Sequence, residues 1–223
     1  KLAKIYPQEN NIELAQCYCE YVQSLNSENT IEKRQILQKA LLVSSRCVRA
    51  SILLAELDME EENYPQAIKN LEEVLRQNPD YIGEVLSSLK LCYKKLDQLD
   101  NFELFLIRAE QQVKNDEVDL ALARLLEEKD GKAAAQTKLY QQLIKKPSTL
   151  IFHRFIQYQI DDAEEGRGKD SLILLYKMVG ERIKQSAAYR CSNCGYQIHK
   201  LLWNCPSCRH WETIKPLSAQ EHN

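Results

Sequence analysis

Residues 48–81 read VRASILLAELDMEEENYPQAIKNLEEVLRQNPDY, and the pattern in this stretch decides the fold. Its first half carries a large residue followed by a small one, Leu54-Ala55, within a helical apolar stripe. Its second half begins at Pro65, which suits the first turn of a helix, and places Ala67 on the inner face. Pro79 stops this second helix, because proline cannot continue one. The stretch therefore predicts a helical hairpin.

The features of this hairpin recur at a constant interval along the chain. One apolar position follows that interval through the whole helical region: Leu37, Leu71, Phe105, Leu139 and Ile173. Twice the same interval joins Pro79 to Pro147 and Ala67 to Ala135. Small residues let helix backbones approach and large ones fill the groove alongside, so these are the positions that stacked hairpins need. We interpret the interval, about 34 residues, as the length of a structural repeat.

A helical period of this length is the signature of tetratricopeptide repeats. The predicted helices span 9–25, 30–43, 47–61, 65–77, 80–97, 100–114, 117–129, 132–146, 148–164 and 169–186. They form about five repeats, some degenerate, with Asn101 in place of the alanine found at Ala67 and Ala135. We predict an all-α fold for residues 1–188, a right-handed tetratricopeptide-repeat superhelix. The concave face of such a superhelix usually binds peptides or proteins.

The composition excludes most other fold classes. Six Gly and six Pro in 223 residues are too few for the turns of a sandwich or barrel, whereas 44% hydrophobic residues allow a sizeable core. A net charge of −2 gives no general attraction to nucleic acid or to anionic membranes. The longest apolar runs reach about five residues, where a membrane-spanning helix needs roughly 20.

The start of the sequence is unusual. The first residue is Lys1, and residues 2–7 read like the end of a helix stopped by Pro7. We therefore expect the sequence to be a fragment of a longer protein, so the lack of an apolar segment here says little about that protein.

The eight cysteines fall into two groups. Cys17, Cys19, Cys47 and Cys92 are scattered through the helical region without a spacing that suits ligands, so we expect them to act as small apolar residues. A long, helical, Gly-poor chain is unlike the small, loop-rich domains that disulfides stabilise, which favours a reducing compartment. We expect His153, on an aromatic-rich helix, to pack or to line the groove. Candidate groove-lining aromatic residues are Tyr18, Tyr21 and Tyr158.

The second group of cysteines forms two C-x2-C pairs near the end of the chain. Cys191 and Cys194 are followed, after ten residues, by Cys205 and Cys208. The two-residue spacing lets a tight turn aim both sulfurs at one ion, and two such knuckles complete a tetrahedron of thiolates. We predict these four cysteines as the ligands of one metal ion. Aromatic flanks and a short gap favour zinc, whereas paired knuckles look like rubredoxin, which holds iron, so the metal is iron or zinc.

The two knuckles differ in the residue that follows each pair. Gly195 suits the left-handed conformation that such turns often need, whereas Arg209 occupies the corresponding position, so we expect the two halves to be inequivalent. His199 and His210 lie nearby, but four thiolates already complete the tetrahedron. No open coordination position or carboxylate base is predicted, which indicates a structural metal.

The terminal module, residues 189–223, is too short to fold on its own core, so the metal should supply much of its stability. Tyr189, Tyr196, Trp203 and Trp211 are many aromatic residues for so short a segment. We expect some of them to form a small core over the knuckles and others to dock the module on the last helices. Because the linker around residues 184–188 is short, the module should be packed on the repeats and not tethered.

The repeats followed by a terminal rubredoxin-like knuckle pair resemble the cytoplasmic part of the lipopolysaccharide assembly protein B family of Gram-negative bacteria. The resemblance covers nearly all of the chain, and its most specific segment runs from residue 189 through residue 216. The turn at 162–167 and the segment 178–181 are also similar. The metal ligands of the family carry over onto the four cysteines of the knuckles.

The resemblance implies an inner-membrane protein whose N-terminal helix is missing from this sequence and whose domain here faces the cytoplasm. It further implies a non-enzymatic adaptor that promotes degradation of the deacetylase committing precursors to lipid A, by the membrane-bound AAA+ metalloprotease FtsH. Other lipopolysaccharide assembly proteins are further candidate partners. The groove residues of the family follow no motif, so none carries over.

Two alternative functions compete with the adaptor. The first is electron transfer, with the four cysteines as a working rubredoxin centre and the repeats as a docking surface. The second is nucleic-acid binding, but from residue 189 onward four basic and two acidic side chains make too weak a phosphate-binding surface. No Gly-rich phosphate loop, G-x-S-x-G or H-E-x-x-H motif appears, so we predict no enzyme.

Overall fold

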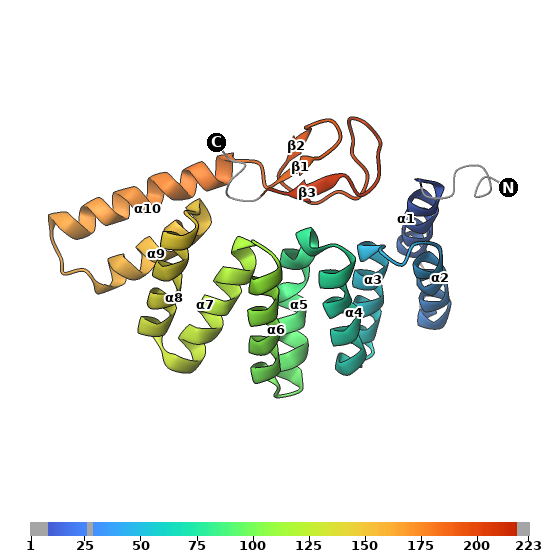
Figure 1. Cartoon of the computed structure of the whole chain (residues 1–223), viewed down its shortest axis with the longest axis horizontal. Coiled ribbons are helices and arrows are strands. Elements are labelled where there is room, and N and C mark those ends of the chain that lie inside the picture. Colours follow the sequence, from blue (N-terminus) through green and yellow to red (C-terminus); the bar gives the residue numbers. More distant parts are fainter. Residues whose placement is uncertain (1–8, 26–28, 218–223) are drawn as a thin grey trace. The chain divides into compact units, whose positions relative to one another are not determined.

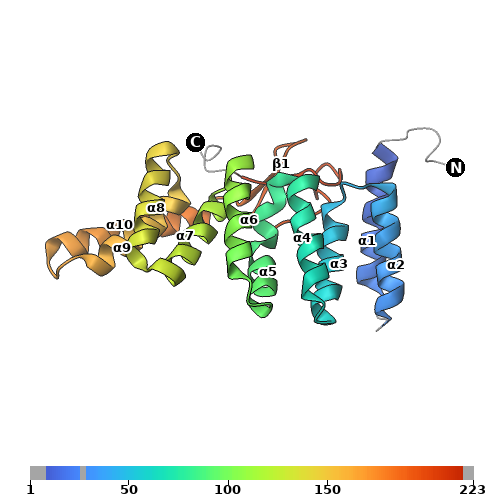
Figure 2. The same cartoon turned by 60° about the horizontal axis from the view of Figure 1, so that its bottom comes forward.

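The computed structural model describes residues 9–25 and 29–217; the expected helix end at Pro7 lies outside these ranges. Within them, ten α-helices precede three short strands (Figures 1 and 2). The helices are α1 (Glu9–Ser24), α2 (Thr30–Val43), α3 (Val48–Glu60), α4 (Tyr64–Gln77), α5 (Ile82–Lys95), α6 (Leu99–Gln112), α7 (Asp116–Asp130), α8 (Lys132–Lys145), α9 (Thr149–Asp162) and α10 (Arg167–Gln185). A short 3-10 helix, η2 (Pro79–Tyr81), joins α4 to α5. All ten predicted helices are thus confirmed.

Contacts divide the chain into two compact units. The first comprises Lys1–Phe102, Arg190–Tyr196 and Leu201–Pro216, and the second comprises Glu103–Tyr189, Gln197–Lys200 and Leu217–Asn223. In the first unit α1 pairs with α2 and α3 with α4, and in the second α7 pairs with α8 and α9 with α10. Consecutive helices in each pair run in opposite directions (Figure 1), as expected for helical hairpins.

Short polar residues fix where several helices begin. The side chain of Asn29 accepts a hydrogen bond from the backbone N–H of Glu32 at the start of α2. Asn115 and Ser148 cap α7 and α9 in the same way. Such caps satisfy N–H groups that have no partner inside the helix. At α4 a proline occupies the first turn instead, as the sequence predicts.

Four of the five repeated apolar positions, Leu37, Leu71, Phe105 and Leu139, are buried in the cores, whereas Ile173 on α10 is only half-buried. Ala67 and Ala135 are completely buried, and Leu71 and Leu139 are 2% and 0% exposed. In the first unit, besides Ala67 and Leu71, the core contains a cluster of buried residues: Ala15, Cys19, Val22, Ile36, Leu37, Ala40, Cys47, Ala50, Leu53, Leu54 and Leu57. In the second unit the corresponding cluster is Leu120, Ala123, Ala135, Leu139, Ile151 and Tyr158. Each fully buried leucine contributes about 1.5–3 kcal/mol, so the repeats are stabilised mainly by apolar burial.

The degenerate position behaves differently from its counterparts. Asn101 is exposed, near the start of α6, whereas Ala67 and Ala135 are buried at the same point of their repeats. The boundary between the two compact units falls directly after the next residue, Phe102. One departure from the repeat pattern thus lies beside the point where the contacts divide the chain.

The strands follow the last helix after a three-residue link. They are β1 (Tyr189–Cys191), β2 (Gln197–Ile198) and β3 (Ile214–Pro216), and they form one sheet in the order β2-β1-β3. Strand β3 is thus an edge strand of the sheet, with one side that pairs with no other described strand. Among the described helices, none combines the length and apolarity needed to cross a bilayer.

Candidate metal centre

The two C-x2-C pairs bring four sulfur atoms into one cluster. The Sγ atoms of Cys191, Cys194, Cys205 and Cys208 all lie within 4.8 Å of one another. The distance from Cys191 Sγ to Cys208 Sγ is 3.7 Å, and that from Cys194 Sγ to Cys205 Sγ is also 3.7 Å. Metal–sulfur bonds of about 2.3 Å in a regular tetrahedron place the sulfurs about 3.8 Å apart. The cluster therefore has the dimensions of a four-cysteine metal site.

Each knuckle has the same backbone turn. The N–H of Gly195 donates to the carbonyl of Cys191 at 2.9 Å, and the N–H of Arg209 donates to the carbonyl of Cys205 at 2.9 Å. Gly195 has φ +76° and Arg209 has φ +62°, so both residues are left-handed. The expectation that the knuckles are inequivalent is wrong for the backbone. Arg209 accepts the conformation at some cost, because a side chain at this φ is strained.

Backbone N–H groups point at the sulfurs, as the spacing predicts. Those of Asn193 and Cys194 donate to Cys191 Sγ, and the corresponding two groups of the second knuckle donate to Cys205 Sγ. Thr213 Oγ1 lies 3.3 Å from Cys191 Sγ. Such hydrogen bonds favour thiolate over thiol, and thiolate is the form that binds metal.

The environment separates the acidities of the thiols. The Asn193 side chain and then the backbone N–H of His210 lower the pKa of Cys208 to about 5. Burial raises the pKa of Cys205 to about 11. At neutral pH the cluster therefore contains at least one thiolate ready for a cation, and a bound cation would deprotonate the others.

One edge of the cluster faces solvent. Cys191 and Cys205 are 2% and 0% exposed, whereas Cys208 is half-buried and Cys194 is exposed. In the described part of the chain, no histidine or carboxylate joins the four sulfurs. His210 instead places Nδ1 2.9 Å from the carbonyl of Cys208. Four sulfurs complete a tetrahedron, so the donor set fits a closed zinc or iron site.

The module is packed on the repeats through Tyr81. This side chain, at the end of η2, is 1% exposed, and its hydroxyl donates to the carbonyls of Ile214 at 2.9 Å and Glu212 at 3.3 Å. The centroids of the Tyr81 and Trp203 rings lie 5.3 Å apart. A tyrosine thus satisfies carbonyls at and beside the edge strand β3 and supplies an apolar face to a tryptophan.

Two further polar contacts join the module to the helical part of the first unit. Gln16 Nε2, on α1, donates to Glu212 Oε1 at 2.7 Å, and Lys215 pairs with Asp80 at 2.8 Å. Burial raises the pKa of Glu212. The prediction of a packed module is confirmed within the first unit, whereas docking on the last helices stays a prediction. The docking groups are Gln16, in the middle of α1, and the Asp80–Tyr81 pair, directly before α5.

Of the aromatic candidates for a binding groove, Tyr21 is exposed, Tyr18 packs partly buried against the core of the first unit, and the other two have structural roles. Tyr158 is 2% exposed, and its hydroxyl hydrogen-bonds to Glu127, which also pairs with Arg154. His153 stacks on Tyr176 with ring centroids 4.0 Å apart, and burial lowers its pKa. The interpretation of His153 as a packed residue is confirmed, whereas Tyr158 is a core residue.

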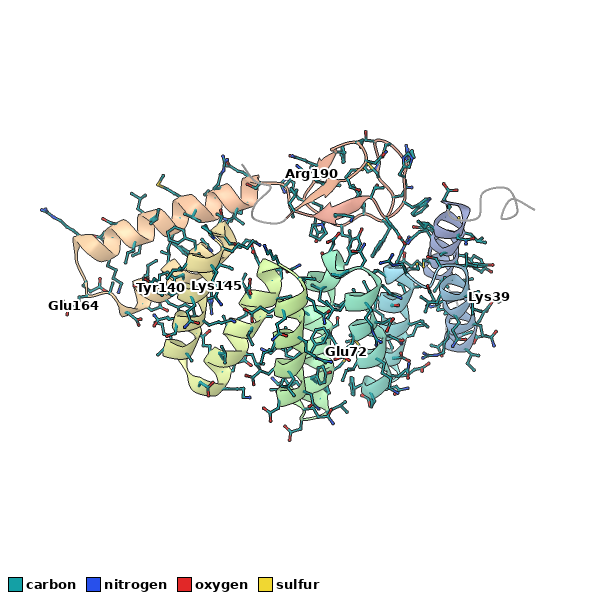
Figure 3. All side chains as sticks on the ribbon, viewed as in Figure 1. Lys39, Glu72, Tyr140, Lys145, Glu164 and Arg190 are labelled. Atoms are coloured by element: carbon teal, nitrogen blue, oxygen red, sulfur yellow. The ribbon has the colours of Figure 1, made fainter. Side chains whose placement is uncertain are left out.

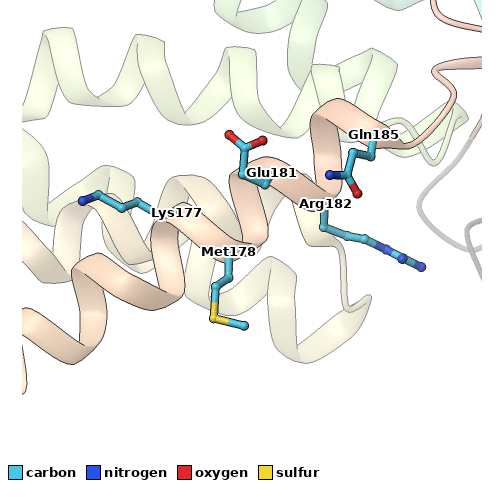
Figure 4. Close-up of a pocket in the computed structure, with 5 residues that line it drawn as sticks. All are labelled: Lys177, Met178, Glu181, Arg182 and Gln185. Carbon is cyan, nitrogen blue, oxygen red and sulfur yellow. The ribbon is translucent and has the colours of Figure 1, made fainter.

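Two other exposed places on the surface are Tyr140 and a depression along α10. Tyr140, labelled in Figure 3, is 55% exposed on α8 and lies 6.0 Å from the ring of Phe155. A shallow depression along α10 is lined by Lys177, Met178, Glu181, Arg182 and Gln185 (Figure 4). Its mixed charges and single thioether belong to one helix face and form no group of converging ligands.

The scattered cysteines include one pair that the sequence does not suggest. Cys19 Sγ, on α1, lies 3.9 Å from Cys47 Sγ, directly before α3, and both residues are completely buried. Cys92 is also buried, whereas Cys17 is exposed. Apolar packing is therefore confirmed for Cys19, Cys47 and Cys92 and is wrong for Cys17. No local spacing signals the pair, because its two members are far apart in the sequence.

Comparison with known proteins agrees with the two-part architecture. A family described as a rubredoxin metal binding domain matches residues 189–216, and the SHNi-TPR family matches residues 52–76, inside the hairpin 48–81. A solved structure of a human IFIT1 dimer with m7Gppp-AAAA aligns with 75% of this chain and 42% of that chain. Its 20% identity and TM-score of 0.39 are too low to support any conclusion.

Curated relatives match along the whole chain. Lipopolysaccharide assembly protein B of Haemophilus influenzae is 76% identical over 223 residues, which cover 100% of this chain and 56% of that protein. The protein of the same name from Escherichia coli K12 is 34% identical over 218 residues, 97% of this chain and 56% of that protein. The chain thus spans little more than half the length of these relatives. Over its whole length, the chain is a homologue of lipopolysaccharide assembly protein B.

Proposed function

We propose that the chain is a non-enzymatic adaptor in lipopolysaccharide biosynthesis, with a repeat region at 1–188 and a metal module at 189–223. One observation carries the proposal: a module with a four-thiol cluster is packed, through Tyr81 and Gln16, on repeats of a kind that binds proteins. The relatives, named for lipopolysaccharide assembly, supply the pathway.

In this proposal the metal has a structural role. Cys191, Cys194, Cys205 and Cys208 hold one zinc or iron ion, which joins the two knuckles through four thiolates. The ordered knuckles keep Glu212 in place, and this residue contacts α1 through Gln16. The module then completes the surface of the first unit, and partner proteins bind the repeats.

The partners follow from the family resemblance. The adaptor would bring the deacetylase of the lipid A pathway to the protease FtsH and so promote its degradation. It would act at the cytoplasmic face of the inner membrane, held there by a helix outside this sequence. Other lipopolysaccharide assembly proteins are further partners in the proposal, and nucleic acid is not.

The test is the lifetime of the deacetylase in cells that lack their own assembly protein B. The natural protein containing this chain is expressed in three forms: unchanged, with Cys205→Ser and Cys208→Ser, and with Cys92→Ser as a buried-thiol control. The unchanged and control forms should shorten the half-life of the deacetylase several-fold and co-purify with the protease, and the double variant should do neither. Equal lifetimes with and without the unchanged protein would refute the adaptor.

The second candidate function is electron transfer. The rubredoxin-type match and the exposed sulfur of Cys194 favour it, because an electron must reach the centre from solvent or a partner. Metal analysis and voltammetry of the purified chain separate the two functions. One iron per chain with a red colour and reversible reduction would support electron transfer. A colourless zinc form that fully restores deacetylase turnover would exclude it.

A further inference from the structure

Cys19 and Cys47 form a pair of thiols apart from the metal cluster. Their Sγ atoms are 3.9 Å apart, and the residues join the middle of α1 to the start of α3. Both residues are 0% exposed and belong to the apolar core of the first unit. They are therefore held as neighbours by the packing of two helices that are not consecutive in the chain.

The surroundings distinguish the two sulfurs chemically. Cys47 is the residue that caps α3, and Gln16 Nε2 lies 3.6 Å from its sulfur. A hydrogen bond from Cys19 lowers the pKa of Cys47 against the effect of burial, and the N–H of Ala50 adds to this. The same hydrogen bond, together with burial, raises the pKa of Cys19. Of the two sulfurs, Cys47 is thus the one that receives hydrogen bonds favouring its thiolate form.

The chain offers natural controls for this pair. Cys92 is buried in α5, and no cysteine sulfur lies near it among the described contacts. Cys17 is exposed on α1, two residues from Cys19, so its side chain leaves the helix in a different direction. Cys92 therefore serves as the control for a single buried thiol, and Cys17 as the control for a single exposed one.

We propose that Cys19 and Cys47 are a modification site, an oxidisable dithiol that a peroxide closes into a disulfide between α1 and the start of α3. The Cys47 thiolate attacks the O–O bond and becomes a sulfenic acid, while hydroxide leaves and takes a proton to form water. The Cys19 sulfur then attacks the Cys47 sulfur, and a second water leaves with the proton of Cys19. Two electrons pass from the sulfurs to one peroxide.

The geometry needs only a small movement for this reaction. A disulfide bond is about 2.05 Å long, so rotation of the side chains and a slight approach of α1 must close the gap. Both sulfurs are buried, so a compact oxidant is required. We therefore expect hydrogen peroxide to act faster than glutathione disulfide.

The pair lies next to the contact that holds the metal module. The Gln16 amide that approaches Cys47 also donates to Glu212 of the module. The new bond would therefore form beside this contact and link α1, which carries Gln16, to the start of α3.

The test uses the full chain with its metal bound and the substitution Cys17→Ser. The protein is treated with hydrogen peroxide, the remaining thiols are alkylated, and tryptic peptides are identified by mass spectrometry. Cleavage at lysine and arginine leaves residue 19 in the peptide 5–33 and residue 47 in the peptide 47–49, so a bond between them gives one distinctive linked peptide. Cys47→Ser in the same background is the matched control.

We expect the linked peptide to rise at least tenfold over the untreated protein and to vanish with dithiothreitol. It should be absent from the Cys47→Ser control, and Cys92 should remain alkylated. The proposal is overturned if Cys19 and Cys47 are both recovered alkylated under conditions that oxidise Cys17 in the unchanged chain. It is equally overturned if they are oxidised singly to sulfinic or sulfonic acid without linkage.

Discussion

The repeat hairpin at 48–81 and the module at 189–216 are ordered by opposite means. The hairpin buries a regular set of aliphatic side chains, including Leu54, Ala67 and Leu71. In the module, the described apolar residues that are fully buried are Ile214 and two of the four metal-site cysteines. Apolar burial can therefore hold the hairpin, whereas the module depends on its thiols and on the surface beneath it.

The two regions also differ in how far along the chain their contacts reach. Helices within a hairpin are sequence neighbours, so their packing forms locally. The hydrogen bond from Tyr81 to Ile214 joins residues 133 positions apart, and that from Gln16 to Glu212 spans 196. The module is thus held by a few long-range polar contacts, and it should be the first region to lose its structure when one support is removed.

Removal of the metal should have the largest effect and should affect one region only. Structural zinc sites contribute on the order of 10 kcal/mol to folding, far more than the module can gain from its own core. Both tryptophans of the chain, Trp203 and Trp211, lie in the module, so their fluorescence reports on it alone. With a chelator or with Cys205→Ser, we expect the emission to shift to that of exposed tryptophan while far-ultraviolet circular dichroism keeps most of its helical signal.

A buried-thiol control shows that the effect comes from the metal site. Cys92→Ser removes a buried sulfur outside the cluster and should leave tryptophan emission unchanged. If the chelated protein kept buried tryptophans, the module would be stable without its metal, and the contrast between the two regions would disappear.

A core substitution in the repeats should instead lower the stability that the helical signal reports. Leu139 is completely buried, so Leu139→Ala should lower the free energy of unfolding by about 2–5 kcal/mol, measured by urea titration of the helical signal. Leu42→Ala is the matched control, because Leu42 is 86% exposed and should lose less than about 0.5 kcal/mol. Equal losses in the two variants would show that the repeat pattern does not define the core.

The same contrast explains what the sequence predicts well. Helices are confirmed because their signals are local: Pro65 opens α4, and the alanines at 67 and 135 are buried where the period places them. The four-thiol cluster also follows from local spacing, since each C-x2-C turn aims two sulfurs together. Nearly all of the fold and the geometry of the candidate site are thus encoded by short-range patterns.

What the sequence does not predict depends on contacts between distant residues. Nothing about Tyr81 marks it as the docking residue, because any aromatic residue at the end of a hairpin looks the same in sequence. The pairing of Cys19 with Cys47 depends on how α1 packs on α3. Arg209 adopts a left-handed turn for which sequence favours glycine, because the two cysteines before it, Cys205 and Cys208, must both reach the cluster.

The repeats contain a buried carboxyl whose titration should alter stability. Burial raises the pKa of Asp119 from 3.8 to about 6, against the hydrogen bond from Gln142 and with help from Glu110 and Asp116. The folded protein therefore holds this proton more tightly than the unfolded one between about pH 4 and 6, and stability falls as the pH rises through that window. Asp119→Asn should remove the fall and stabilise the protein by roughly 3 kcal/mol at pH 7 but hardly at pH 3.5.

Urea titrations at the two pH values measure this difference. Asp97→Asn, at an exposed turn, is the control and should give parallel shifts near zero. If Asp119→Asn destabilised the chain equally at both pH values, the carboxylate would be a structural acceptor for Gln142 whose charge is of no consequence.

The smallest expected effect tests the contact between the two regions. Tyr81→Phe keeps the ring against Trp203 but removes the hydroxyl that donates to the carbonyls of Ile214 and Glu212. One lost hydrogen bond costs about 1 kcal/mol, and the carbonyls left behind are buried against the mutated ring. The urea midpoint of tryptophan emission should therefore fall, while the midpoint of the helical signal moves less.

Tyr140→Phe, at a half-exposed tyrosine of α8, should move neither midpoint. Because Tyr81 is itself part of the repeats, equal shifts in both signals would mean that the module and its supporting hairpins unfold as one unit, and the difference in how they are stabilised would not extend to how they unfold.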